Sequence, residues 1–164
     1  MVEEWGLEEW REEILNRWNE INLYTMTRGV NRYKGLAMAL SEIREKYCGI
    51  EDLDVLKKWV EESPELSNGA LERAIEEHGS ICLKKALSWS IKVNQSIDRL
   101  PQEDKRPFDG VAQALEKAHR DADVAIVSSA NLGAVLDEWD LYGLLEYTDV
   151  VLAQDAGSRA FCIG

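Results

Sequence analysis

The chain has 164 residues, of which 31 are acidic and 19 basic, giving a formal net charge of −12. This charge repels nucleic-acid backbones and anionic lipids, so we expect no nucleic-acid partner and no membrane partner. No apolar run approaches the roughly 20 residues that cross a bilayer, and no signal peptide is recognisable, which predicts a cytoplasmic protein. The cysteines and histidines are widely separated and lack the spacing of a zinc site.

Residues 1 to about 100 predict helices throughout, because apolar residues recur there at three- and four-residue steps. The expected apolar stripes run through 7–21, 33–47, 56–60, 71–75 and 83–97. Helices joined by short breaks form an antiparallel bundle. Its core is predicted to include Trp10, Trp18, Trp59 and Trp89.

Local signals predict where several of these helices begin and end. Gly49 is placed to end the second helix in a left-handed conformation, and Gly79 to end the fourth. Ser63-Pro64 stops the third helix, because the residue before a proline avoids the helical conformation. Ser67 is a suitable N-cap for the fourth helix.

After residue 100 the pattern changes to an alternation of helices and strands. We expect a helix at 108–119, a strand at 124–127, a helix at 132–139 and a strand at 150–153. This order indicates an α/β fold with a parallel sheet. The predicted organisation is a helical domain at 1–100, a proline-containing linker at 101–107 and a partial α/β domain at 108–164.

Each predicted strand is followed by a small polar cluster. Ser128, Ser129 and Asn131 follow the first strand, and Arg159 follows the second. Ligands of parallel α/β sheets bind at the carboxyl ends of the strands, where hydroxyls, helix N–H groups and an arginine suit a phosphate group. The alternative is that Ser129 or Asn131 only caps a helix and that Arg159 is a solvated arginine.

A second candidate lies in the polar break at 24–32 of the helical region. Arg28 and Arg32 are cations in an acidic chain, placed in a loop that could face an anionic substrate. The alternative is a simple connection between helices, in which Asn31 caps the second helix and both arginines are solvated. The two interpretations stay open.

The runs at 123–131 and 149–159, with a helix between them, resemble the haloacid dehalogenase-like (HAD-like) hydrolase superfamily, in its phosphatase-like branch with a helical cap. The resemblance implies a Rossmann-like core, with Ser128 as the phosphate-holding second motif. Arg159 takes the place of the basic third motif, which is usually lysine. Residues 1 to about 100 would then be the cap that closes over the active site and contributes to substrate choice.

The chain departs from the family pattern at the other two motifs. The family's nucleophile is the first aspartate of an Asp-x-Asp that follows an apolar strand. The pairs Asp52/Asp54 and Asp121/Asp123 have this spacing, but neither follows such a strand. The acidic pair that completes the family's Mg²⁺ site would fall after Gly164, so we expect no family metal ligand in this chain.

The resulting hypothesis is a fragment of a Mg²⁺-dependent phosphatase that acts on a small phosphorylated metabolite through an aspartyl-phosphate. These 164 residues alone are expected to be inactive. One alternative is a non-catalytic helical module for protein interaction, whose α/β part only packs against the bundle. Another is a nucleotide binder, against which stands the absence of any G-x-G-x-x-G or P-loop motif. The substrate's identity and the oligomeric state are left open.

Overall fold

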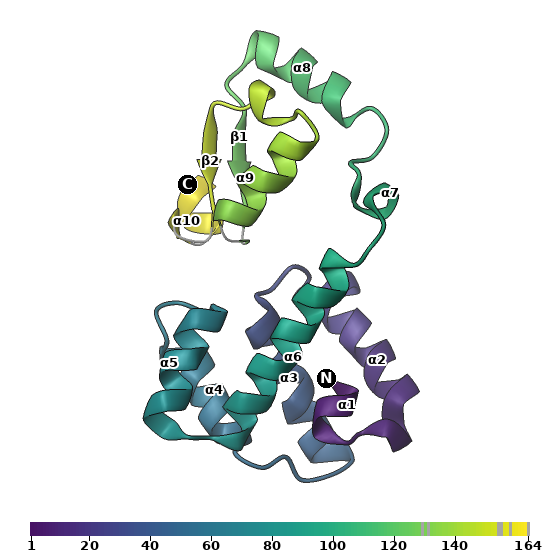
Figure 1. Ribbon diagram of the computed structural model, residues 1–164, viewed down its shortest axis with the longest axis vertical. Coiled ribbons are helices and arrows are strands. Elements are labelled where there is room, and N and C mark those ends of the chain that lie inside the picture. Colours follow the sequence, from purple (N-terminus) through teal and green to yellow (C-terminus); the bar gives the residue numbers. More distant parts are fainter. Residues whose placement is uncertain (129, 131, 154–155, 158, 164) are drawn as a thin grey trace. The chain divides into compact units, whose positions relative to one another are not determined.

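The computed structural model describes residues 1–164 except 129, 131, 154–155, 158 and 164. The chain forms two compact units, a helical unit, Met1–Arg99, and an α/β unit, Leu100–Gly164 (Figure 1). Most described residues are helical, and the strands among them form one parallel two-stranded sheet. The mostly helical content and the pair of parallel strands are as predicted.

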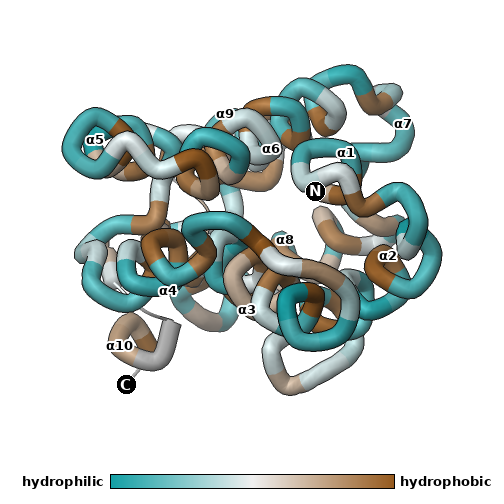
Figure 2. The backbone as a smooth tube through the Cα atoms, turned by 90° about the horizontal axis from the view of Figure 1, so that it is seen from below, coloured by the Kyte–Doolittle hydropathy of each residue, from teal (hydrophilic) through white to brown (hydrophobic). Residues whose placement is uncertain are grey.

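Six α-helices build the helical unit. They are α1 (Val2–Trp5), α2 (Arg11–Asn19), α3 (Arg32–Lys46), α4 (Leu53–Glu62), α5 (Asn68–His78) and α6 (Ile81–Asp98), with a 3₁₀ turn η1 (Glu8–Trp10) and a π-helical turn η2 (Glu20–Tyr24). Helix α6 packs against α1, α4 and α5, and α3 packs against α2 and α4. In Figure 2, apolar positions alternate with hydrophilic ones along the helices, as amphipathic helices require.

The core of the helical unit is mainly aliphatic and includes the buried aromatic side chains Tyr33, Trp59 and Trp89. Leu36, Leu40, Leu56, Leu71 and Leu83 are fully buried. Of the predicted core tryptophans, Trp59 and Trp89 are buried, whereas Trp10 and Trp18 pack against the core and stay partly exposed. The two partly exposed rings make aromatic contacts. The ring centroids of Trp18 and Trp89 lie 5.5 Å apart in an edge-on arrangement, and those of Trp10 and Tyr47 lie 5.4 Å apart.

The predicted helix ends are confirmed in α4 and α5 but not in α3. The Ser67 side chain accepts a hydrogen bond from the Ala70 amide, and Gly79 ends α5 with a φ of 63°. The prediction for Gly49 is wrong, because α3 ends at Lys46 and Gly49 has no positive φ. The amides of Tyr47 and Cys48 both bond to the Ile43 carbonyl, so the helix closes before the glycine is reached.

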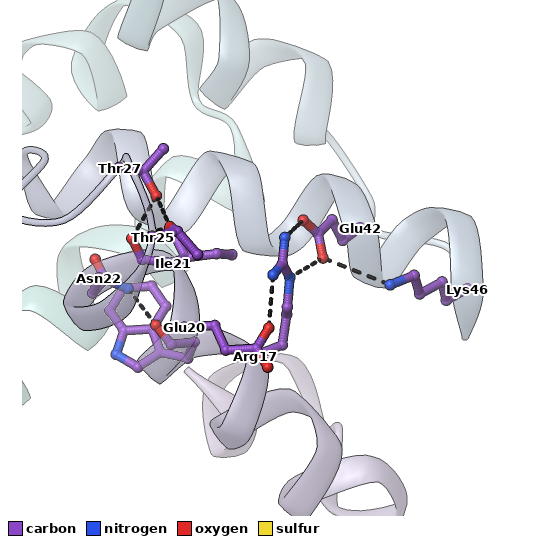
Figure 3. Close-up of polar contacts among 9 residues, drawn as sticks. Arg17, Glu20, Ile21, Asn22, Thr25, Thr27, Glu42 and Lys46 are labelled. Carbon is purple, nitrogen blue, oxygen red and sulfur yellow. Dashed lines mark hydrogen bonds and ion pairs between the residues drawn. The ribbon is translucent and has the colours of Figure 1, made fainter.

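An ion-pair cluster joins α2 to α3 (Figure 3). The Arg17 guanidinium donates two hydrogen bonds of 2.8 Å to the Glu42 carboxylate and one of 2.7 Å to Glu20. Lys46 lies 3.7 Å from the same Glu42 carboxylate. The hydrogen bonds from Arg17, followed by the charges of Arg17 and Lys46, lower the pKa of Glu42 despite its partial burial.

The α/β unit is a β-α-β crossover with further helices around it. Its elements are α7 (Gln102–Lys105), α8 (Val111–Asp121), β1 (Ala125–Val127), α9 (Leu132–Leu141), a 3₁₀ turn η3 (Leu145–Tyr147), β2 (Val150–Leu152) and α10 (Arg159–Ile163). The strands are parallel, with Ile126 opposite Val151. Four described apolar side chains are buried in this unit, namely Ile126, Val135, Leu144 and Ala153. Its core is therefore small.

No described helix of the protein is long and apolar enough to cross a membrane.

We expect Glu42→Gln to make the stability of the protein less sensitive to acid. Since the pKa of Glu42 is lowered in the fold, its carboxylate contributes stability above the ordinary pKa of 4.5, and this contribution is lost as the pH falls below it. Urea unfolding followed by circular dichroism between about pH 5 and about pH 3 should show a smaller loss in the variant. Glu45→Gln, on the exposed side of α3, is the control. It should lose as much stability between these pH values as the unchanged chain does.

Candidate functional site

Ser128 stands at the carboxyl end of β1, where the sheet gives way to the polar segment. Its amide donates to the Leu152 carbonyl at 2.9 Å, which carries the pairing with β2 one residue beyond the strand. Its Oγ accepts a hydrogen bond from the Ala130 amide at 3.1 Å. A hydroxyl that accepts from the backbone still has its own hydrogen to donate. Within the described residues, Ser128 is therefore held in place and its hydroxyl hydrogen has no acceptor.

Arg159 is the first residue of α10, and α10 packs against β1. Because β1 and β2 are parallel, the segments that follow them leave the sheet at the same edge. The structure thus brings the start of α10 and Ser128 to one edge, as the strand order predicts. The Arg159 side chain lies outside the described part, as do residues Ser129 and Asn131, so their predicted roles stay predictions.

Gly157 permits the close approach of the chain between β2 and α10. It has a φ of +119°, a conformation that residues with a side chain rarely adopt. A Cβ atom at this position would also lie 3.0 Å from the Phe161 ring of α10. The turn into α10 therefore depends on glycine.

Arg32 is held inside the helical unit by neutral partners on α6. Its Nη1 donates to Asn94 Oδ1 at 2.6 Å and to Ser90 Oγ at 3.0 Å. Ser90 is fully buried and donates in turn to Asn68. Asn31 caps α3, since its side chain accepts from the Tyr33 amide. The structure therefore gives Arg32 a packing role and leaves its predicted contact with substrate untested.

Arg28 differs from Arg32, because it is exposed and no ion pair of its side chain occurs in the described part of the chain. It follows the turn η2, and the residues just after η2 form hydrogen bonds to carbonyls within it (Figure 3). The Thr25 amide donates to the Glu20 carbonyl at 3.0 Å, and Thr27 Oγ1 donates to the Ile21 carbonyl at 2.5 Å. Sequence reasoning missed that this tight turn exposes Tyr24 and Met26.

The first Asp-x-Asp pair makes structural contacts, and the second flanks the loop between α8 and β1. Asp52 precedes α4, and its carboxylate accepts from the Ile81 amide at 3.0 Å. Asp54 pairs with Arg44 at 2.9 Å. Asp121 ends α8 and Asp123 comes before β1, at the amino end of the strand. None of the four follows a described strand.

At the amino end of the sheet, Asp149 just before β2 contacts both α8 and the residue that precedes β1. Its Oδ2 accepts from the Val124 amide at 2.7 Å and lies 3.2 Å from His119 Nδ1 on α8. Its own amide donates to the Val124 carbonyl at 2.8 Å. The sequence carries no signal for this cluster, because its members meet only when α8, β1 and β2 assemble.

The family resemblance leads us to expect a Mg²⁺ site in the complete enzyme. In the described residues no three His, Cys, Asp or Glu side chains come together as metal ligands. A cavity of about 850 Å³ between α4 and α5 includes none of the predicted site residues.

Arg32→Met is expected to destabilise the helical unit, by about 1–2 kcal/mol, because hydrogen bonds from a charged donor to Ser90 and Asn94 are lost. Arg28→Met, the matched control on the exposed turn, should leave the free energy of unfolding unchanged. Urea unfolding of both variants measures the difference. Equal stability of the two would contradict the packing role of Arg32.

No family model, curated protein or solved structure matches the chain. The assignment of function therefore depends on the geometry of the chain itself.

Proposed function

We propose that the chain carries the phosphate-binding edge of a HAD-like hydrolase, a phosphatase for a small phosphorylated metabolite. The observation that supports this most directly is the parallel β-α-β unit. In it Ser128 directly follows β1, and α10, which begins at Arg159, follows β2 and packs against β1. A polar residue and a basic residue thus follow neighbouring strands at one edge.

The chemistry of these two residues suits a phosphoryl group. The phosphate oxygens are acceptors, and the Ser128 hydroxyl has a hydrogen to donate. Arginine remains charged at all physiological pH values, and its planar fork matches two phosphate oxygens. Helix α9 begins four residues after Ser128, and the unpaired amides of a helix N-terminus favour anions.

Phosphoryl transfer needs more than a phosphate holder. An aspartyl-phosphate mechanism requires a carboxylate in line with phosphorus, and Mg²⁺, when bound, offsets the charge of the two anions that meet. In this chain Ser128 and Arg159 hold the phosphoryl oxygens, and neither residue attacks phosphorus. We therefore assign binding of the phosphoryl group to these residues, and no transfer step.

The helical unit serves as the cap in this proposal. It has its own aliphatic core, and its exposed Arg28 lies beside the tight turn η2. An exposed cation in an acidic unit suits an anionic substrate. The alternative, a helical module for protein interaction, is favoured by the same turn, because Tyr24 is 78% exposed and Met26 fully exposed. Apolar and aromatic side chains of this kind are enriched in protein interfaces.

Ser128→Ala and Arg159→Gln are expected to weaken the binding of inorganic phosphate to the chain. Loss of one hydrogen bond to an anion should cost about threefold to tenfold in affinity, and loss of the guanidinium more than about tenfold. Isothermal titration calorimetry with inorganic phosphate measures both. The matched controls are Ser96→Ala on α6 and Arg106→Gln before α8, which should bind like the unchanged chain. Phosphate binding that survives both site substitutions contradicts the proposal.

The 164-residue chain should not hydrolyse p-nitrophenyl phosphate, with or without added Mg²⁺. The residue that directly follows β1 is a serine, and no Asp-x-Asp follows either strand. A steady-state assay at high protein concentration checks this expectation. Turnover that Arg159→Gln abolishes would overturn the assignment of binding without transfer.

A further inference from the structure

The amino end of the sheet is held by one carboxylate that three segments share. Asp149 Oδ2 accepts from the Val124 amide at 2.7 Å, and the Asp149 amide donates to the Val124 carbonyl at 2.8 Å. The side chain thus adds a rung to the pairing of β1 with β2. The same Oδ2 lies 3.2 Å from His119 Nδ1 in the last turn of α8. Asp149 therefore connects α8 to the start of both strands.

The contact between His119 and Asp149 is favourable only when His119 Nδ1 carries a hydrogen. Its Nδ1 is buried, and in the described structure it makes no hydrogen bond of acceptable geometry, although a carboxylate oxygen is within ion-pair distance. If Nδ1 carried no hydrogen, its lone pair would face the lone pairs of Asp149, which is repulsive. A hydrogen on Nδ1 turns the contact into an attraction, and a second proton on the ring adds a full charge to it.

Charged and titratable side chains other than Asp149 lie on α8 and on the elements next to it. From α8 these are Glu116, which pairs with Arg120, and Lys117. The turn η3 packs against α8 and brings Glu146 and Tyr147. The pKa of Tyr147 is raised, first by the charge of Glu146 and also by that of Glu116, so the carboxylates act across this contact. Asp121 and Asp123 follow His119 closely in the sequence, so these nearby segments carry more acidic than basic residues.

His119 lies near the carboxyl end of its helix. The last turn of a helix carries partial negative charge from its unpaired carbonyls, and a cationic side chain there is stabilising. His119 belongs to this last turn of α8, together with Arg120. Histidine is also the side chain whose charge ordinarily changes between about pH 5 and about pH 8.

We propose that His119 and Asp149 form a proton-dependent clasp that fastens α8 to the amino end of the sheet and tightens when His119 is protonated. The clasp consists of the His119 ring, the Asp149 carboxylate and the Val124 amide. It lies at the end of the sheet opposite to Ser128, and β1, three residues long, is all that separates Val124 from Ser128. The proposal does not depend on phosphate binding, because it concerns how firmly the two strands are joined.

The test is hydrogen exchange of the Val124 amide in the ¹⁵N-labelled full chain, expressed as a protection factor so that the intrinsic pH dependence of exchange cancels. Between about pH 8 and about pH 6, protection of Val124 should rise about threefold to tenfold. The rise should vanish in His119→Gln and in Asp149→Asn, whose carboxamide oxygen still accepts from Val124 but carries no charge. His78→Gln, which removes the other histidine of the chain, is the control and should behave like the unchanged chain.

A second measurement needs no variant. The ¹⁵N chemical shifts of the ring nitrogens of His119 should show the hydrogen on Nδ1 in the neutral form, whereas His78, which lies half-exposed on α5, is the internal reference. The clasp is overturned if protection of Val124 does not change with pH, or if its change persists in His119→Gln. A neutral His119 that carries its hydrogen on Nε2 alone would contradict an attraction between His119 and Asp149 in the neutral form.

Discussion

The parallel pairing of β1 with β2 is the constraint on which the candidate site depends. Three residue pairs set the register, with Ile126 opposite Val151. A parallel pair needs a crossover, and α9 supplies it, so the segments after both strands leave the sheet at one edge. A slip of one residue would turn Ile126 from the core to the surface and would displace Ser128 from its bond to Leu152.

The sheet is secured by polar bonds at both ends, because its apolar core is small. Four described side chains of the α/β unit are buried, whereas α8 has none that is fully buried. At one end the Ser128 amide bonds to Leu152, and at the other the Asp149 carboxylate bonds to the Val124 amide. The helical unit depends more on apolar burial than on polar bonds, since one continuous hydrophobic core joins α3, α4, α5 and α6.

The two arginines of the helical unit show how packing separates residues that look alike in sequence. Arg28 and Arg32 lie four positions apart in one polar break. Arg32 reaches acceptors on α6 that are about 60 residues away along the chain, and these contacts are invisible to local reasoning. Arg28 stays on the exposed turn. The structure thus gives Arg32 a structural role, whereas the exposed position of Arg28 fits both a solvated arginine and the proposed contact with an anion.

The sequence by itself determined the longer helices and the two strands with their order, because periodicity and caps such as Ser67 and Gly79 act over a few residues. It did not predict the short helices α1, α7 and α10. It also placed a serine and an arginine after successive strands. The tertiary structure decided the rest: the early end of α3 before Gly49, the packing of Arg32, and the meeting of His119 with Asp149. These outcomes depend on contacts between segments far apart in the chain, for which short-range patterns carry no signal.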